Sequence, residues 1–486
     1  MDNLSSLSYF VPELFLSAAI LVVIVLDLLL KKEQKIWTGI VSAAVLVISV
    51  FLIFQQYTMP ASEIFRGMLV LDSMAAFIKL IAAVSSLIII LFSLPYFDDK
   101  SEYYVLILIT TLGMFLMGAV NDILMIIIAM ELVGLMSYVL TGFTKRNIKS
   151  NEASLKYILY AATSTGVMAF GFSYLYGLTG ETNLIKIQQA LMTNPPHQVA
   201  YFITLILILA GIGYKVAMVP FHFWLPDVYE GAPTTITAFF SIGPKAAGMA
   251  VLIRFFTTVV AHGSSQAAAF LQNLQVNTPQ LLAVLAVLTM TFGNVVALRQ
   301  TNIKRLMAYS SIAHAGYMLM AMVVFSPQGY KAVLFYLVVY MFMNFGAFWV
   351  IITISQKLGS EEIDAFRGLG YRSPYAAVAM AVFLFSLTGL PPLAGFIGKF
   401  YLFAAVVQGG WYVLAVLGVL NSVISLYYYA YIVKQMFLRT VEEQTPVPIN
   451  LYEGVVLTML LVPTLLFGVY WSPLLRITEI SFNLLY

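Results

Sequence analysis

The sequence predicts an all-α polytopic membrane protein, and three observations support this fold class. Of its 486 residues, 61% are hydrophobic and only 10% are charged, whereas a soluble domain has about 25% charged residues. The apolar residues come in runs of about 20, long enough to cross roughly 30 Å of hydrocarbon as a helix. A transmembrane β-barrel would show short alternating segments instead.

Fourteen such runs are expected to form transmembrane helices, and turn signals such as Asn121-Asp122 and Pro195-Pro196 separate them. The N-terminal stretch MDNLSSLSYFVPEL lacks the basic region and cleavage site of a signal peptide, so we expect the first run to remain a helix. The expected spans are 9–30, 36–55, 72–94, 103–119, 123–143, 154–177, 200–219, 233–259, 279–298, 306–325, 332–356, 375–406, 411–433 and 452–472.

The distribution of basic residues in the loops predicts the orientation. The loops after odd-numbered helices hold fifteen Lys and Arg, whereas the even loops and the C-terminal tail hold four. Cytoplasmic loops are the ones enriched in Lys and Arg, so both termini are expected on the periplasmic side. The fifteen are Lys31, Lys32, Lys35, Lys100, Lys145, Arg146, Lys149, Arg299, Lys304, Arg305, Lys357, Arg367, Arg372, Lys434 and Arg439, and the four are Arg66, Lys186, Lys331 and Arg476.

Six basic residues fall within the expected spans. Lys79, Lys156 and Arg254 lie toward span ends, where long side chains can reach the interface. The other three lie deeper and beside prolines, which break helices and free backbone carbonyls that can line a wet cavity. These are Lys215 with Pro220 and Pro226, Lys245 with Pro244, and Lys399 with Pro391-Pro392.

The segments LAGIGYK at 209–215 and LAGFIGK at 393–399 match each other and both end in one of these lysines. They lie on expected helices 7 and 12, five helices apart, so the matching helices cross the membrane in opposite directions. This arrangement is typical of inverted repeats in transporters. We therefore expect helices 4–8 to repeat as helices 9–13, with helices 7 and 12 broken. The corresponding divisions are 1–100, 101–260, 261–440 and 441–486.

A buried glutamate and lysine are well suited to proton transfer. Glu131 lies about eight residues into the fifth span, or roughly 12 Å from its start. Burial weakens the hold of a lysine on its proton, and a nearby carboxylate strengthens it. A Glu131–Lys215 pair with two separations would switch the lysine between holding and releasing a proton. A static buried ion pair is the structural alternative for these two residues.

Two histidines are further candidates. His314 lies in the repeat position that corresponds to Glu131, and His222 lies near a helix end. A histidine can exchange protons near neutral pH. Each of the two is equally well explained as a hydrogen-bonded packing residue, His222 at the membrane interface.

Three segments resemble the antiporter-like subunits of respiratory complex I. They are HFWLPDVYEGAP at 222–233, SSIAHAGY at 310–317 and LPPLAGFIGKF at 390–400. The resemblance extends over nearly the whole chain and is strongest to the subunit N type, because Lys399 replaces the glutamate of subunit M and no long lateral helix follows helix 14. It implies that Glu131, Lys215, Lys245 and Lys399 form a polar axis in mid-membrane, with helices 7 and 12 discontinuous.

The resemblance also implies a function: proton translocation by a subunit of NADH:quinone oxidoreductase, a translocase, in the bacterial inner membrane. Other membrane subunits, especially other antiporter-like ones, would be its partners. The chain has no cysteine and no nucleotide-binding motif. We therefore expect no cofactor or metal bound by this chain, with NADH, FMN, iron–sulfur clusters and quinone in other subunits.

Other functions remain open at this stage. A subunit of a multi-subunit sodium/proton antiporter would share the Glu and Lys pattern, as would membrane hydrogenases and plastid-type complexes. A scaffold subunit that moves no ions is the alternative from a different class. Its buried charges would be replaceable without loss of pumping.

Overall fold

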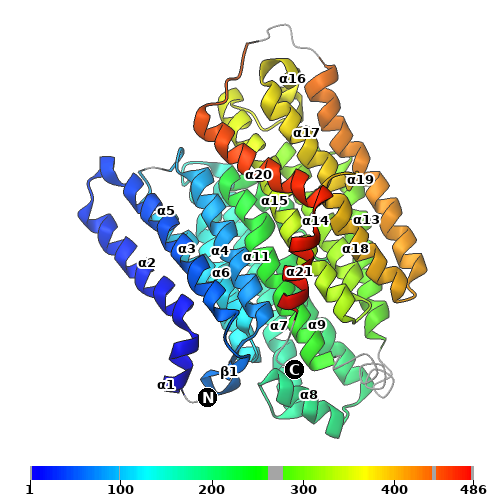
Figure 1. Cartoon of the computed structure of the whole chain (residues 1–486). Coiled ribbons are helices and arrows are strands. Elements are labelled where there is room, and N and C mark those ends of the chain that lie inside the picture. Colours follow the sequence, from blue (N-terminus) through cyan, green and yellow to red (C-terminus); the bar gives the residue numbers. More distant parts are fainter. Residues whose placement is uncertain (1–2, 98, 261–276, 440–444, 483–486) are drawn as a thin grey trace. The chain divides into compact units, whose positions relative to one another are not determined.

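The computed structural model describes residues 3–97, 99–260, 277–439 and 445–482. Its chain forms two compact units, coloured along the sequence in Figure 1. Unit 1 comprises Met1–Val216, Gly231–Thr278 and Glu479–Tyr486, and unit 2 comprises Ala217–Glu230 and Pro279–Thr478.

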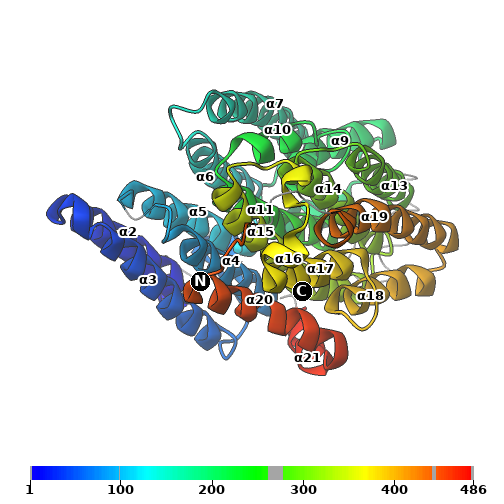
Figure 2. The ribbon, with the colours of Figure 1, turned by 90° about the horizontal axis from the view of Figure 1, so that it is seen from above.

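Unit 1 consists mainly of long helices. Its helical elements are α1 (Asn3–Ser6), η1 (Leu7–Tyr9), α2 (Val11–Leu29), η2 (Lys32–Gln34), α3 (Ile36–Gln56), η3 (Phe65–Gly67), α4 (Ser73–Ser93), α5 (Ser101–Ala119), α6 (Ile123–Thr141), α7 (Ile148–Thr179), α8 (Leu184–Thr193), α9 (Gln198–Val216), α11 (Thr234–Phe255) and η4 (Phe256–Val260). The strands β1 (Ser62–Ile64) and β2 (Leu69–Leu71) pair antiparallel, with Glu63 opposite Val70. Helix α11 is buried along nearly its whole length and forms the core. Helices α2 and α3 pack side by side at one edge of the unit (Figure 2).

Unit 2 is built around α15, which packs against α14, α17, α18 and α20. Its helical elements are α10 (Trp224–Gly231, whose last residue belongs to unit 1), α13 (Thr278–Ala297), α14 (Ile303–Met322), α15 (Pro327–Leu358), η5 (Ile363–Phe366), α16 (Leu369–Arg372), α17 (Pro374–Thr388), α18 (Ala394–Gln408), α19 (Tyr412–Leu438), α20 (Leu451–Val469) and most of α21 (Ser472–Ser481). Most residues of α15 are buried, from Gly329 to Ser355.

All fourteen predicted spans are present as helices. Within the described residues, twelve helices are long and apolar enough to cross a membrane. Helix α14 supplies a thirteenth span that is more polar, and the short apolar pair α17 and α18 supplies the fourteenth. The prediction of a polytopic helical membrane protein is therefore confirmed. Helix α8 was not predicted, because a ten-residue amphipathic helix does not stand out in a loop.

Several helices begin where a short polar side chain can cap them. Asp122 accepts a hydrogen bond from the amide of Leu124 at 2.8 Å, and Asn302 accepts one from Arg305 at 3.0 Å. Such caps satisfy backbone donors that a helix leaves unpaired at its first turn. The turn predicted at Asn121-Asp122 is thus the start of α6, which fixes the position of Glu131 two turns further along.

Both predicted helix breaks are present. Helix α9 ends at Val216 and helix α10 begins at Trp224, so residues 217–223 interrupt the seventh span. Residues 389–393 separate α17 from α18, and each of these two helices has only 15 residues. At 1.5 Å per residue, such a helix is about 22 Å long, less than the roughly 30 Å of hydrocarbon. The twelfth span therefore needs both halves to cross the membrane.

The five-helix repeats stay a prediction. Lys215 is the penultimate residue of α9 and precedes its break, whereas Lys399 is the sixth residue of α18 and follows its break. The two LAG segments thus lie on opposite sides of their breaks, so this match does not align the two halves residue by residue. The expected divisions of the chain also stay a prediction, and the boundaries at 261 and 440 lie outside the described residues.

Two of the three basic residues assigned to span ends are instead buried in ion pairs. Arg254 donates to both carboxylate oxygens of Asp72, at 2.8 and 2.9 Å, and is 2% exposed. Lys79 lies 2.5 Å from a carboxylate oxygen of Glu13 and is 1% exposed. Their positions at the interface were therefore wrongly predicted. The third residue, Lys156, pairs with Glu152 on the helix surface and is 39% exposed.

Breaking the Asp72–Arg254 pair is expected to destabilise unit 1 strongly. In Asp72→Ala, the Arg254 guanidinium stays buried without its counter-charge, at a cost of about 3–5 kcal/mol. The side chain of Asp72 also caps α4, which adds about 1 kcal/mol. Thermal unfolding of the chain in purified membranes, followed by its loss from the soluble fraction after detergent extraction, measures the effect.

Asp27→Ala is the matched control, because the Asp27–Lys35 pair is partly exposed and an exposed pair contributes only about 0–1 kcal/mol. Asp72→Asn retains a capping oxygen and should fall between the two. An Asp72→Ala chain as stable as the Asp27→Ala chain would contradict a structural role for the buried pair.

Candidate functional site

Unit 1 brings three of the predicted residues onto helices that pack together. Glu131 lies on α6, Lys215 on α9 and Lys245 on α11, and α11 packs against both other helices. Gly248 of α11 allows a close approach, because a Cβ at this position would lie 3.2 Å from Lys215 Cγ. Lys245 precedes Gly248 by three residues and so lies on the same side of α11. Both lysines are almost fully buried, at 5% and 2% exposure.

Glu131 and Lys215 do not form a direct ion pair. Glu131 is half-buried, and its helix α6 packs against α11, as does the Lys215 helix α9. Among the ion pairs of the described residues, neither side chain has a direct partner of opposite charge. The structure thus differs from the static ion pair weighed as the structural alternative. A separated pair of this kind can still close, which a switch between two separations requires.

An aromatic cluster holds this region together. Tyr138 of α6 meets Tyr157 of α7 edge to face, with ring centroids 4.8 Å apart. Tyr214, the neighbour of Lys215, donates a hydrogen bond to the backbone oxygen of Tyr157 at 3.2 Å. Phe240 of α11 also packs on the Tyr157 ring. The rings therefore fix the mutual positions of the helices that carry Glu131, Lys215 and Lys245.

In unit 2, Lys399 lies against the helix break. Its ammonium donates hydrogen bonds to the backbone oxygen of Thr388 at 2.7 Å and to Ser422 Oγ at 2.9 Å. The same ammonium lies 4.6 Å from the centre of the Tyr317 ring, a distance at which the ring face attracts a cation. The Lys399 side chain is 3% exposed. Its charge is thus surrounded by groups that stabilise a cation without neutralising it.

The break itself creates this cation site. Thr388 is the last residue of α17, and the last carbonyls of a helix have no intrahelical partner and carry the negative end of its dipole. Gly389 follows with a positive φ of 94°, and a Cβ there would lie 2.9 Å from Lys399 Cδ. Glycine is therefore required both for the turn and for the approach of the lysine.

His314 lies in a network of hydroxyl groups in the same unit. Its Nδ1 is 2.5 Å from the Tyr336 hydroxyl, and its Nε2 is 3.3 Å from the Tyr429 hydroxyl. Tyr429 shares a further short hydrogen bond with Ser310. Each ring nitrogen of His314 can donate or accept, depending on the tautomer. A proton could therefore enter the imidazole on one side and leave on the other.

A second set of polar groups extends from the ring that faces Lys399. Asn294 donates to the Tyr317 hydroxyl at 3.3 Å and to Asn421 Oδ1 at 3.2 Å. The hydroxyl of Tyr428 donates to Asn294 Oδ1 at 3.0 Å. Tyr317 lies one turn after His314 on α14, with ring centroids 5.8 Å apart. The neighbourhoods of His314 and Lys399 are thus connected through α14.

His222 is separate from these polar groups. It lies in the break before α10, is 2% exposed, and packs between Phe223 and Phe292 with ring centroids 4.3 and 4.4 Å away. Its Nδ1 has no hydrogen-bond partner within the described chain. The structure therefore places it in an aromatic environment, and its position at the membrane interface stays a prediction.

Sequence analysis missed the groups that surround the predicted residues. Tyr429, Asn294 and Ser422 lie outside the segments that carry the resemblance, and Tyr317, which ends SSIAHAGY, was not singled out among the 29 tyrosines of the chain. The one signal that could have indicated such residues is a position one helical turn from a predicted residue, as Tyr317 lies one turn after His314. In the described ranges, no three His, Cys, Asp or Glu side chains gather as a metal site would require.

Comparison with known proteins gives consistent matches over the whole length. Residues 120–425 match the family described as NADH:quinone oxidoreductase/Mrp antiporter, transmembrane. The NADH-quinone oxidoreductase subunit N 2 of Chloroherpeton thalassium is 44% identical over 98% of this chain and 95% of that protein. A chain of respiratory complex I from Thermus thermophilus, solved with bound aureothin, is 31% identical, with a TM-score of 0.81 over 96% of this chain and 98% of that one.

A chain of the Mrp complex from Dietzia sp. has a TM-score of 0.84, covering 97% of this chain and 96% of that one, at 21% identity. Identity at that level supports a shared fold and nothing finer. Relatives with 41–44% identity over nearly the full length are subunit N proteins, and relatives with 38–39% identity are subunit 2 proteins of NAD(P)H-quinone oxidoreductases.

Proposed function

Because the chain belongs to the NADH:quinone oxidoreductase/Mrp antiporter transmembrane family, and to its subunit N type, we propose that it translocates protons as a membrane subunit of an NADH:quinone oxidoreductase. In this proposal the complex lies in a bacterial inner membrane, with both termini of this chain on the periplasmic side. Other membrane subunits of the complex, including antiporter-like ones, are its partners. NADH, FMN, iron–sulfur clusters and quinone act in those other subunits.

The observation that carries the proposal is the environment of Lys399. A buried lysine is costly in a membrane, by about 2.5–3.5 kcal/mol even on insertion scales. Here its ammonium is held by the carbonyl of Thr388 and the hydroxyl of Ser422 at a broken helix. Because both partners are neutral, the ammonium can lose its proton and leave no unpaired charge behind. In a fixed ion pair, loss of that proton would leave a buried carboxylate uncompensated. Discontinuous helices at mid-membrane are also where transporters bind their ions.

Each predicted residue then has a role in the proposed proton path. Lys245 accepts a proton that enters from the cytoplasm, and Lys399 releases one toward the periplasm. The Glu131–Lys215 pair sets the timing: when the pair closes, the carboxylate favours the protonated lysine, and when it opens, the lysine releases its proton. His314 transfers protons through the Tyr336 and Tyr429 hydroxyls. His222 has no step in this scheme.

The sodium/proton antiporter alternative is not favoured, because the similarity to the Mrp chain supports the fold alone. We expect the purified complex, reconstituted into proteoliposomes, to acidify their lumen when NADH and a quinone are added. Lumen acidification should proceed at the same rate with and without sodium, because the proposed path transfers protons only. A pH-sensitive dye trapped inside the vesicles measures the rate.

An uncoupler added to the same vesicles is the control, and it should abolish the pH change while NADH oxidation continues. Acidification that requires sodium, or that ceases in sodium-free buffer, would assign the chain to ion exchange instead.

A further inference from the structure

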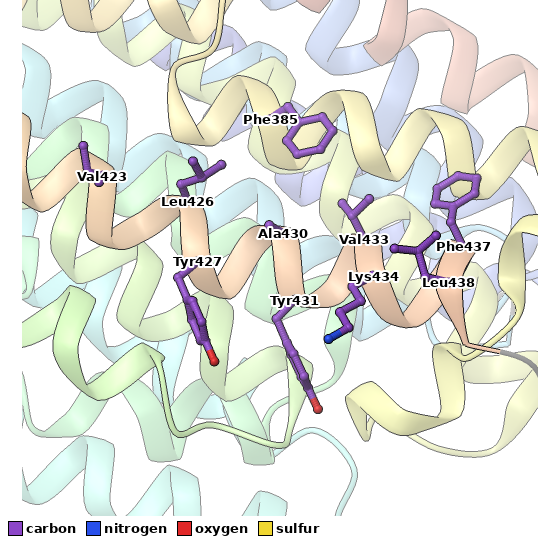
Figure 3. A pocket seen from close by; sticks show the side chains of 10 residues that line it. All are labelled: Phe385, Val423, Leu426, Tyr427, Ala430, Tyr431, Val433, Lys434, Phe437 and Leu438. Carbon is purple, nitrogen blue, oxygen red and sulfur yellow. The ribbon is translucent and has the colours of Figure 1, made fainter.

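A long apolar groove runs along the outer face of α19. It has a volume of about 710 Å³ and is lined by α19 residues and by Phe385 of α17 (Figure 3). Val423, Tyr427 and Leu438 lie at 62%, 66% and 76% exposure, although all are apolar or aromatic. Of the residues that line the groove, only Lys434 is charged. In Figure 3, Tyr427, Tyr431 and Lys434 project in the same direction from α19.

The groove continues toward Lys399. A second cavity of about 310 Å³ shares Val423 and Leu426 with it and is also lined by Thr388, Ser422 and Lys399. Those three residues form the hydrogen bonds that hold the Lys399 ammonium. One apolar surface therefore extends from a lysine at the end of α19 to the polar centre of unit 2.

The dimensions of this surface match one leaflet of a bilayer. Lys434 lies in the last turns of α19, which ends at Leu438, and Ser422 precedes it by twelve residues. Twelve helical residues span about 18 Å, and half of the hydrocarbon core is about 15 Å. An acyl chain whose headgroup lies at Lys434 would therefore end beside Ser422 and Lys399.

We propose that the groove binds one anionic phospholipid, with its headgroup at Lys434 and one acyl chain along α19 as far as the cavity beside Lys399. The cationic end of the groove favours an anionic headgroup over a zwitterionic one. Tyr431, one turn from Lys434, supplies an amphipathic ring of the kind that sits near headgroups. The end of the acyl chain excludes water from this side of Lys399. The assignment does not depend on whether Lys399 transfers protons.

Photocrosslinking in the assembled complex tests this site. The complex is placed in phosphatidylcholine nanodiscs that contain one of two probe lipids, phosphatidylglycerol or phosphatidylcholine. Each probe lipid carries a diazirine near the end of its acyl chain. Adducts are located by mass spectrometry of peptides after irradiation. We expect adducts between Val419 and Leu426 with the phosphatidylglycerol probe, about fivefold more than with the phosphatidylcholine probe.

Lys434→Gln should reduce the phosphatidylglycerol adducts to the phosphatidylcholine level, whereas the same change at Lys331, a residue of unit 2 outside the groove, should not. Ala430→Trp, which fills the groove, should remove the adducts of both probes. Comparable amounts of assembled complex on native gels confirm that the variants fold.

Two results would overturn the proposal. Equal labelling by both probes that is insensitive to Lys434→Gln would mean that bulk lipid merely touches this face. A photoreactive amino acid at Tyr431 that crosslinks to a neighbouring subunit, with no lipid adducts, would mean that a protein covers the groove.

Discussion

Lys399→Met is expected to reduce NADH-driven proton uptake by about 10²-fold, the low end of the range for a positioned proton-transfer group. Methionine has a similar volume but cannot hold a proton, so the bonds from the Lys399 ammonium to Thr388 and Ser422 are lost. Proton uptake by inverted membrane vesicles, measured together with NADH oxidation, gives the result. NADH oxidation should fall in parallel if it is coupled to this path.

Two controls separate lost chemistry from lost structure. Lys156→Met removes a lysine whose ion pair is on the helix surface and should leave proton uptake unchanged. Ser422→Ala removes one of the two hydrogen bonds and should reduce uptake only about tenfold, because a hydrogen bond to a charged group contributes about 1.5 kcal/mol at the low end of its range. Full proton uptake in an assembled Lys399→Met complex would exclude Lys399 from the path.

Lys215→Ala is expected to reduce both proton uptake and coupled NADH oxidation by about 10²-fold in complexes that still assemble, which leaves a further tenfold decrease measurable. Glu131→Gln should reduce both rates less, by about tenfold, because it removes the charge that controls the lysine but leaves the lysine in place. In the proposed switch the two residues act on each other electrostatically. The double variant should therefore be no slower than Lys215→Ala alone, since residues that act as a unit are not additive.

The readout that distinguishes a switch from a structural pair is this non-additivity. If the losses of Glu131→Gln and Lys215→Ala multiply in the double variant, the residues act independently and the proposed timing role is wrong. If Lys215→Ala pumps at the wild-type rate, the lysine is structural.

The sequence predicted the framework of the fold because the bilayer constrains it so strongly. Apolar runs of helical length locate the spans, and Pro391-Pro392 located the break between α17 and α18. The errors concern partners that lie far apart in the chain. Lys79 was assigned to the interface because it lies toward the end of its span, and its partner Glu13 lies 66 residues earlier in the chain.

The candidate site was predicted in its charges but not in its surroundings. A lysine within an apolar run is conspicuous because its burial is costly, so Lys215, Lys245 and Lys399 could be identified singly. Every residue has a backbone carbonyl, so the carbonyl of Thr388 cannot be identified in this way. It can accept a hydrogen bond from Lys399 only because α17 ends at Thr388. Tyr317 owes its position over Lys399 to tertiary packing, on which sequence spacing carries no information.

Helix α14 has a consequence for how the chain enters the membrane. It is buried along nearly its whole length, yet polar residues such as Arg305, Ser310 and His314 keep it out of the helices that are apolar enough to cross a membrane by composition. Only four residues separate it from α15, which is strongly apolar. We therefore expect the two to enter the membrane together as a helical hairpin, with α15 providing the free energy of partitioning. The residues of α14 that we propose for proton transfer would thus make its insertion dependent on the helix synthesised after it.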